Sequence, residues 1–408
     1  MDDRIYDYWA ATLQDGYIGK LIDIVEAAGG ARELYLMSAE KMQSFLGISA
    51  RLAKYIDEHR PEAGRIEDDY NDMAYKGISY VNHTDGDYPE KLQDIASRPY
   101  GLFIKGSLPD PEVPSVAIVG ARECSEYGRT MAEYFGNRLA AEGVQIISGM
   151  AWGIDGISQE AALSAGGRSY AVMGCGPDIV YPARNRVLYD RLTENGNGII
   201  SEYAPATPAM ARRFPPRNRI ISALSDVLIV VEARAKSGTL ITVDMAIEQN
   251  RTVMVVPGRL TDSLSAGCLN LLYQGALPAT GIDAVMDALG IPRRIPSENS
   301  PEGTGTLGKN DESPDASGKK VAPGKSDAAR KSGAKKPEAP VIIKNRELPG
   351  DLGKVESVLT LDPLSAENIA AMAGMPLEKV MILLTRLELE GAAKELWPGF
   401  FVKKPDLA

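Results

Sequence analysis

The residues best placed for chemistry are two arginines and an asparagine in the run FPPRNRIISALSD, residues 214–226. Arg217, Asn218 and Arg219 follow two prolines and precede an apolar segment, so they lie at the start of a predicted helix. Guanidinium and amide groups in such a position can bind phosphate oxygens. The pattern therefore indicates a site that binds a polyanion.

The two arginines stand two residues apart, which on a regular helix would point them to different faces. Both can face one ligand only if Arg217 lies at or before the N-cap, and Pro215 and Pro216 favour this by delaying the helix. We therefore expect Arg217 and Arg219 to share one ligand.

A second helix start follows the strand-like run VLIVVEA, in the segment SGTLITVDMAIEQ. Ser237, Gly238 and Thr239 supply two hydroxyls and, at a helix N-terminus, free backbone N–H groups. We expect this turn to face the same anion as the arginines.

Glycine-rich turns end two further strand-like runs. Arg122 ends the run SVAIVGAR, where it can bind an anion or form a salt bridge at the rim of the sheet. Gly149 and Gly153 in SGMAWGID would let backbone approach a ligand closely, and Asp155 can cap the next helix or bind a ribose-like hydroxyl. Neither turn has the G-x-G-x-x-G spacing, so no dinucleotide cofactor is indicated.

Groups for catalysis are scarce. Glu232 and Asp244 are the carboxylates nearest the turns, and the two histidines, His59 and His83, both lie far upstream. The sequence identifies no basic partner for Cys175, so we interpret it as a small rim residue and not a nucleophile. We expect structural roles for these groups, with no catalytic residue, no metal and no cofactor.

Three aromatic residues near the turns, Trp152, Tyr181 and Phe214, can either stack on nucleobases or pack in the core. The overall composition opposes nucleic-acid binding, since the formal net charge is -10 and the pI about 5.0. Any such binding must come from a local basic patch.

The three cysteines are scattered, no signal peptide is evident, and no apolar run is long enough for a membrane span. We expect a cytoplasmic protein with reduced thiols.

These turns belong to a repeating pattern of buried strands and amphipathic helices over residues 113–290. Each strand-like run ends in small residues: SVAIVGA, VQIISG, SYAVMGC, GIISEY, VLIVVEA and TVMVVPG. Regular alternation of this kind predicts an α/β fold, a Rossmann-like doubly wound and mostly parallel sheet. Ligands of such folds bind beyond the carboxyl ends of the strands, where the turns lie.

The rest of the chain divides by composition. Residues 1–75 predict a small helical domain of the SAM or helix-hairpin-helix type, and residues 76–112 an irregular connector. Residues 296–345 are rich in Gly, Ser, Pro, Ala and Lys and predict a flexible linker.

Residues 346–408 regain helical periodicity and end in an aromatic strand pair, which predicts a winged helix with Leu383, Leu384, Leu387 and Leu389 in its core. Its recognition helix carries only Lys379 and Arg386 as cations, so protein contact is as good an interpretation as DNA contact.

Taken in order, the motifs VGAR, SGMAWGID, AVMGCGPDIVYPARN, ISEY, FPPRNRIISALSD, VLIVVEARAKSGTLIT and VPGRLTDSLSAGCLNLLYQGA resemble the DNA-processing protein A family, DprA or Smf. The resemblance covers about residues 80–280. One departure is Ser158-Gln159, where the family usually has Ala-His.

The resemblance implies a non-catalytic protein that binds single-stranded DNA, protects incoming strands and loads RecA recombinase during natural transformation. It also implies a homodimer formed through the Rossmann-like domain. By motif, the DNA-binding residues would be Arg122, Gly149, Gly153, Arg217, Asn218, Arg219, Ser237, Gly238 and Thr239.

One enzyme alternative stays open: a nucleotide phosphoribohydrolase of the lysine-decarboxylase-like Rossmann group, which also has a glycine-rich phosphate turn and a catalytic glutamate at strand ends. That group uses the signature PGGxGTxxE. This chain has EARAKSGTLITVDMA instead, with Asp244 near the place of the glutamate.

Overall fold

The structure is a computed structural model that describes residues 3–16, 20–291, 350–360, 364–390, 392–397 and 399–403. The chain divides into two compact units, Met1–Thr304 and Gly305–Ala408. The predicted linker, residues 296–345, lies outside the described residues.

The first unit is built on a nine-stranded sheet with the strand order β1-β2-β6-β5-β4-β3-β7-β8-β9 among the described residues. Strands β6, β5, β4, β3, β7, β8 and β9 run parallel to their neighbours in the sheet. Strands β1 and β2 form an antiparallel edge. The strands are β1 Ile78–Asn82, β2 Gly101–Gly106, β3 Ser115–Val119, β4 Gln145–Ser148, β5 Ser169–Met173, β6 Gly198–Ser201, β7 Val227–Val230, β8 Thr252–Val255 and β9 Leu277–Pro278.

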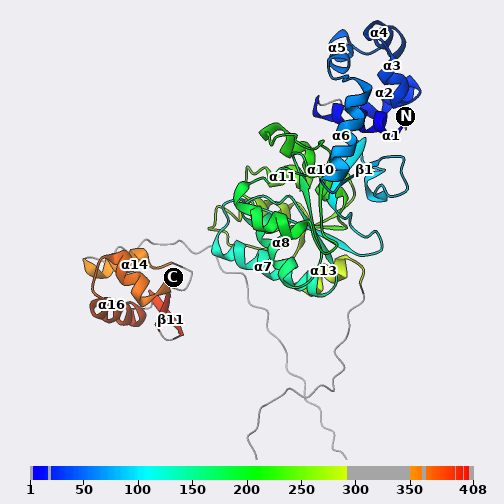
Figure 1. Cartoon of the computed structure of the whole chain (residues 1–408). Helices are drawn as coiled ribbons and strands as arrows, with labels where there is room; N and C mark the ends of the chain where they lie inside the picture. Colours follow the sequence, from blue (N-terminus) through cyan, green and yellow to red (C-terminus); the bar gives the residue numbers. More distant parts are fainter. Residues whose placement is uncertain are drawn as a thin grey trace, which may run out of the picture. The chain divides into compact units, whose positions relative to one another are not determined.

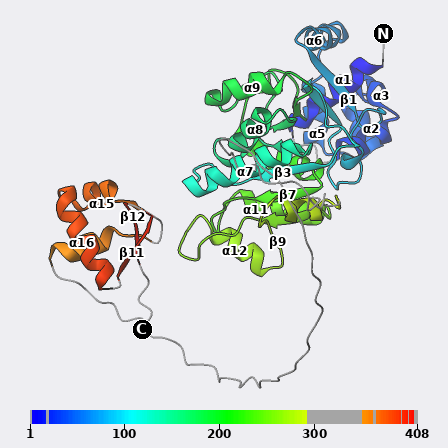
Figure 2. The same ribbon diagram turned by 90° about the horizontal axis from the view of Figure 1, so that it is seen from below.

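The six strands predicted from buried apolar runs are confirmed as β3 to β8. Helices join consecutive strands and cover both faces of the sheet, so the doubly wound fold is also confirmed (Figures 1 and 2). The connecting helices are α7 Glu126–Ala141, α8 Ile154–Ser164, α9 Arg186–Leu192, α10 Phe214–Ala223, α11 Thr239–Glu248 and α12 Ala266–Tyr273, and α13 Ile282–Ala288 follows β9.

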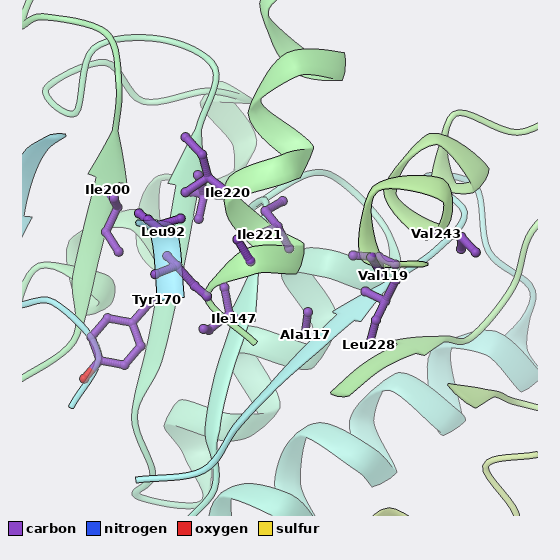
Figure 3. Close-up of a cluster of buried hydrophobic side chains, with 14 of the residues drawn as sticks. Leu92, Ala117, Val119, Ile147, Tyr170, Ile200, Ile220, Ile221, Leu228 and Val243 are labelled. Carbon is purple, nitrogen blue, oxygen red and sulfur yellow. The ribbon is translucent and has the colours of Figure 1, made fainter. Parts of the chain in front are cut away.

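Alternate residues of each strand pack into two separate hydrophobic cores, one on each face of the sheet, because successive side chains of a strand point to opposite faces. Ala117 and Val119 pack with α10 and α11 on one face, where Ile220 and Ile221 of α10 point at the strands (Figure 3). Val116 and Ile118 pack with α7 and α8 on the other face. This is why the strands are apolar throughout.

The segment predicted as an irregular connector, residues 76–112, instead supplies two strands of the sheet. Strand β1 pairs with β2, and β2 pairs with β6. Glycines and prolines around these strands hid the pattern from sequence reasoning, whereas burial of the strand residues Tyr80, Leu102 and Phe103 stabilises them in the fold.

The N-terminal helices share a core with these two strands and lie at the β1 end of the sheet (Figure 1). The core is rich in aromatic rings, among them Trp9, Tyr80 and Phe103. Ser38 accepts a hydrogen bond from the Lys41 N–H and so caps the helix that begins at Ala39. The helices are α1 Arg4–Thr12, α2 Leu21–Ala28, α3 Ala31–Leu36, α4 Ala39–Leu46, α5 Ala50–Glu58 and α6 Ala63–Tyr75.

The second unit is a winged helix, as predicted. Helices α14 Asp351–Val358, α15 Ala366–Ala373 and α16 Leu377–Leu389 pack beside a small antiparallel sheet of β10 Leu364–Ser365, β11 Ala393–Trp397 and β12 Phe400–Lys403. Leu384 and Leu387 are buried as expected, but Leu389 is 85% exposed. The prediction for Leu389 was wrong because it lies two residues after Leu387, on a different side of the helix.

Among the described residues, no single helix has the length and apolar composition needed to cross a membrane. The bent pair of α15 and α16 meets those criteria only when the two helices are taken together.

Candidate nucleic-acid interface

A pocket of about 670 Å³ opens beyond the carboxyl ends of β3 and β7. The chain builds the sheet from β3 toward β6 and then returns to place β7 on the other side of β3. Doubly wound sheets bind their ligands at this reversal, because the loops after the two central strands diverge there. The structure brings six of the nine predicted site residues to this pocket: Arg122, Arg217, Asn218, Ser237, Gly238 and Thr239.

Arg217 is almost fully buried, with 4% of its surface exposed. Its guanidinium donates to the backbone oxygens of Gly149, at 3.0 Å, and Val172, and so ties together the ends of β4 and β5. Burial lowers the pKa of Arg217, while the negative charge of Asp155 opposes that shift. Arg217 therefore forms the positively charged floor of the pocket and positions its walls.

The expectation that Arg217 and Arg219 face one ligand is corrected by the structure. Helix α10 begins at Phe214, ahead of both prolines, so Arg217 and Arg219 are both inside the helix and point apart. Arg219 forms a bidentate ion pair with Glu202, at 2.9 and 2.7 Å, and its Nε donates to the Ser97 oxygen. It lines a different pocket, between the N-terminal helices and the sheet.

The SGT turn begins α11 at the rim of the pocket, but its N–H groups are less free than the sequence predicted. The Thr239 N–H donates to the Ser237 hydroxyl, and the N–H groups of Leu240 and Ile241 donate to the oxygens of Ser237 and Gly238. The turn thus offers an anion the positive end of the helix dipole and the two hydroxyls. Asn218 lies half-buried nearby.

The two predicted glycines act through packing. A Cβ on Gly149 would come within 2.6 Å of the Arg217 guanidinium, so glycine is needed to admit that side chain. Gly153 has a φ of +86° and lies directly against the oxygens of Ala121 and Arg122, which a side chain would strike. Gly149 does not line the main pocket, and Gly153 lines a neighbouring one.

Between these glycines the turn is held by buried polar groups. The Asp155 carboxylate accepts the Gly149 N–H, and burial raises the pKa of Asp155 while Arg217 lowers it. Gln159 accepts the Met150 N–H and donates to the Ser169 hydroxyl and the Tyr170 oxygen. Gln159 therefore fixes the shape of the turn from inside, at the position where the family that the sequence resembles usually has histidine.

Sequence reasoning missed two cations of the pocket, Arg234 and Lys236, both exposed. They stand in the run EARAKSGT, and their place between a strand end and a helix start was the available signal. Arg122 is also exposed. Neither Arg122 nor Lys236 forms an ion pair with another described residue, so both can bind an external anion.

The residues considered for catalysis are buried or lie outside the lining of the main pocket. Glu232 is buried and accepts hydrogen bonds from the Ser125 N–H and hydroxyl at 2.9 and 2.5 Å. Asp244 is exposed on α11 outside the pocket lining. Burial raises the pKa of Cys175 to about 11, so its reactive thiolate is scarce near neutral pH. Among the described residues, no group of three or more His, Cys, Asp or Glu could hold a metal ion.

Two of the aromatic candidates line the main pocket. Tyr181 and Phe214 stack on each other with ring centroids 5.2 Å apart and an interplanar angle of 28°. Tyr181 is 43% exposed, so its ring offers a surface on which a base can stack. Trp152 lies outside this pocket, in the neighbouring one.

A comparison with family models matches residues 79–290 to the family described as DNA recombination-mediator protein A. Residues 339–397 match the DprA winged helix domain. The chain belongs to the DprA/Smf family. The lining residues of the main pocket all lie within the first of these matches, and the second falls within the C-terminal unit.

Individual DprA and Smf proteins are also similar to this chain. The DNA processing protein DprA of Streptococcus pneumoniae is 39% identical over 224 residues, 55% of this chain and 79% of that protein. Protein Smf of Escherichia coli is 40% identical over 202 residues, 50% of this chain and 54% of that protein. The X-ray structure of the S. pneumoniae DprA matches with a TM-score of 0.59 and 31% identity, covering 69% of this chain and 97% of that one.

Proposed function

We propose that this DprA/Smf family member binds single-stranded DNA in the pocket beyond β3 and β7, without catalysing a reaction on it. The observation that carries the proposal is the pair of exposed cations, Arg122 and Lys236, above the buried Arg217. Single-strand binders combine cations that follow the phosphates with aromatic faces that stack on bases. Tyr181 on Phe214 supplies such a face in the same pocket.

The local charge explains how an acidic protein can bind a polyanion. The main pocket is lined by Arg122, Arg217, Arg234 and Lys236 against the carboxylates of Glu123 and Asp155. Salt screens charges beyond about 8–10 Å, so the distant negative charges that make the net charge -10 act weakly on a bound strand.

The finer role is also part of the proposal: the protein protects incoming DNA and loads RecA during natural transformation, as a cytoplasmic homodimer joined through the Rossmann-like domain. Family membership supports it, since the matching family is described as a recombination mediator. The three cysteines are unpaired thiols, which fits a reducing compartment.

The test is the double substitution Arg122→Ala with Lys236→Ala, measured by binding to a labelled single-stranded oligonucleotide across a salt series. Each lost charge-assisted contact is worth about 1.5–3 kcal/mol, so affinity should fall by tenfold or more per residue. Loss of two phosphate contacts should also flatten the salt slope by about 1.4.

A matched control replaces two exposed arginines outside both pocket linings, Arg65→Ala on α6 with Arg138→Ala on α7, which changes the net charge equally. This control should keep the parent's affinity and salt slope. Equal binding by the Arg122/Lys236 variant and the control would rule out the pocket as the DNA site.

The enzyme alternative predicts release of free base from nucleoside monophosphates. Its candidate carboxylates are poorly placed, because Glu232 is buried against Ser125 and Asp244 lies outside the pocket lining. Base release by the purified protein, abolished by Glu232→Gln, would establish that alternative in place of ours.

A further inference from the structure

A second pocket, of about 520 Å³, adjoins the main pocket on the side of the SGMAWGID turn. The two pockets share the lining residues Arg122, Glu123 and Ala151. Arg122 therefore stands on the wall between them, where one guanidinium can bind a phosphate whose two neighbouring nucleosides occupy different pockets.

The second pocket contains an exposed tryptophan, Trp152, with 41% of its surface accessible. The Arg184 guanidinium lies over its indole ring, 3.8 Å from the ring centroid. An indole and a planar guanidinium are both surfaces on which nucleobases stack. The pair is thus a stacking site at which a base can replace the guanidinium on the indole.

The two pockets differ in charge, so that the main pocket favours a phosphate and the second pocket favours a neutral base. The second pocket is lined by three cations, Arg122, Arg129 and Arg184, and by three carboxylates, Glu123, Glu133 and Glu160. Two of these groups are already paired with partners outside the pocket lining, Arg129 with Glu126 and Glu160 with Arg191. A balanced pocket of this kind repels a phosphate more than the cationic main pocket does, but it accepts a neutral base.

Small and apolar residues leave the required space beside the indole. Gly156, Ala161 and Ile157 of α8 form part of the wall, and the half-buried Asn185 side chain is held by the Met150 oxygen at 3.0 Å. The Asn185 side chain in the lining of the second pocket is therefore held in place before a ligand arrives, which reduces the conformational entropy lost on binding.

We propose that the second pocket is a nucleobase subsite, in which one base of the bound strand stacks on Trp152 while the adjoining phosphate lies at Arg122 at the edge of the main pocket. This inference rests on the proposed binding of single-stranded DNA. It adds that the phosphate and the base of one nucleotide are bound in two different pockets.

The experiment compares full-length parent protein with Trp152→Ala and Trp152→Phe. Two probes of equal length are used, a labelled oligothymidylate and the same backbone carrying abasic sites. Trp152→Ala should lower the affinity for oligothymidylate by about 5- to 150-fold, the range for loss of one base–aromatic stack. It should leave the affinity for the abasic probe unchanged, and Trp152→Phe should retain most of the affinity for oligothymidylate.

Tryptophan fluorescence gives a second readout. Trp9 is buried in the N-terminal core, so it should not respond to a bound strand, whereas Trp152 should be quenched by a stacked base. The quench should appear with oligothymidylate, be absent with the abasic probe, and be lost in Trp152→Phe. Tyr75→Ala, which removes a 91% exposed ring from α6, serves as the aromatic control and should bind like the parent.

The outcomes distinguish the two proposals. Unchanged affinity of Trp152→Ala for oligothymidylate, in protein whose circular dichroism matches the parent, overturns the base subsite and leaves the DNA-binding proposal intact. An equal loss on both probes also overturns it, since the tryptophan would then not contact a base. If the parent protein binds neither probe, the proposed function itself fails, and the subsite with it.

Discussion

At the scale of single residues, two neighbouring arginines of one motif have different roles. Arg217 points into the pocket, where its guanidinium binds the oxygens of two strand ends. Arg219 points away, and its ion pair with Glu202 leaves only 14% of the arginine side chain and 7% of the glutamate side chain exposed. Alanine at either position therefore disturbs packing as well as charge, which makes the exposed Arg122 and Lys236 the cleaner probes of DNA binding.

The ion pair yields a stability prediction. Arg219→Ala leaves the Glu202 carboxylate buried without its partner, and breaking a buried pair in this way costs about 3–5 kcal/mol. Replacing both partners by apolar residues of similar volume, Arg219→Met with Glu202→Leu, should recover most of that loss. Urea unfolding of the three proteins measures the difference. If Arg219→Ala were as stable as the parent, the ion pair would contribute nothing to the free energy of unfolding.

At the scale of elements, the pocket depends on how each strand begins as well as on how it ends. The carboxylate of Asp226, just before β7, accepts hydrogen bonds from the N–H and hydroxyl of Ser115 at the start of β3. Lys91 binds the same carboxylate at 2.6 Å. This contact sets the register of the two central strands whose opposite ends carry Arg122 and Lys236.

The Asp226 carboxylate predicts a pH dependence. Burial alone would raise the pKa of Asp226, but hydrogen bonds from Lys91 and Ser115 outweigh it and lower the pKa below its ordinary value. A lowered pKa in the folded state gives stability that is present above the unfolded value, about 3.9, and is lost as the pH falls through the folded pKa.

The measurement is the free energy of unfolding from pH 6 down to pH 3 for the parent and for Asp226→Asn. The variant should be less stable at pH 6 and should lose less stability on acidification. Parallel curves for the two proteins would show that Asp226 carries no part of the acid response.

At the scale of the whole molecule, the described chain is two units, and the N-terminal helices belong with the sheet. Their core includes Tyr80 of β1, Phe103 of β2 and Tyr100 just before β2, from the two edge strands that the sequence did not predict. The C-terminal unit has a separate core of its own, with Val355, Ile369 and Leu384 among its buried residues.

This division predicts opposite results for two truncations. Removing residues 1–75 exposes three aromatic rings of about 150–250 Å² each. At about 25 cal/mol per Å² that costs roughly 11–19 kcal/mol, comparable with the whole stability of a domain, so little folded protein is expected. Removing residues 305–408 should leave the melting temperature of the first unit unchanged. Calorimetry on both truncated chains checks this, and a stable protein without residues 1–75 would contradict the shared core.

The sequence by itself determined the strands β3 to β8 and the family, because these depend on local features: apolar runs and small residues at strand ends. It also placed Arg122 and the SGT turn at strand ends that meet in one parallel sheet. The tertiary structure alone decided the direction of each side chain and the partner it met. Arg217 became a buried support and Arg219 half of an ion pair because α10 starts one residue before the prolines and packs against both the sheet and α11. Trp152 and Arg184, 32 residues apart in the sequence, meet only because the turns after β4 and β5 lie side by side in the fold.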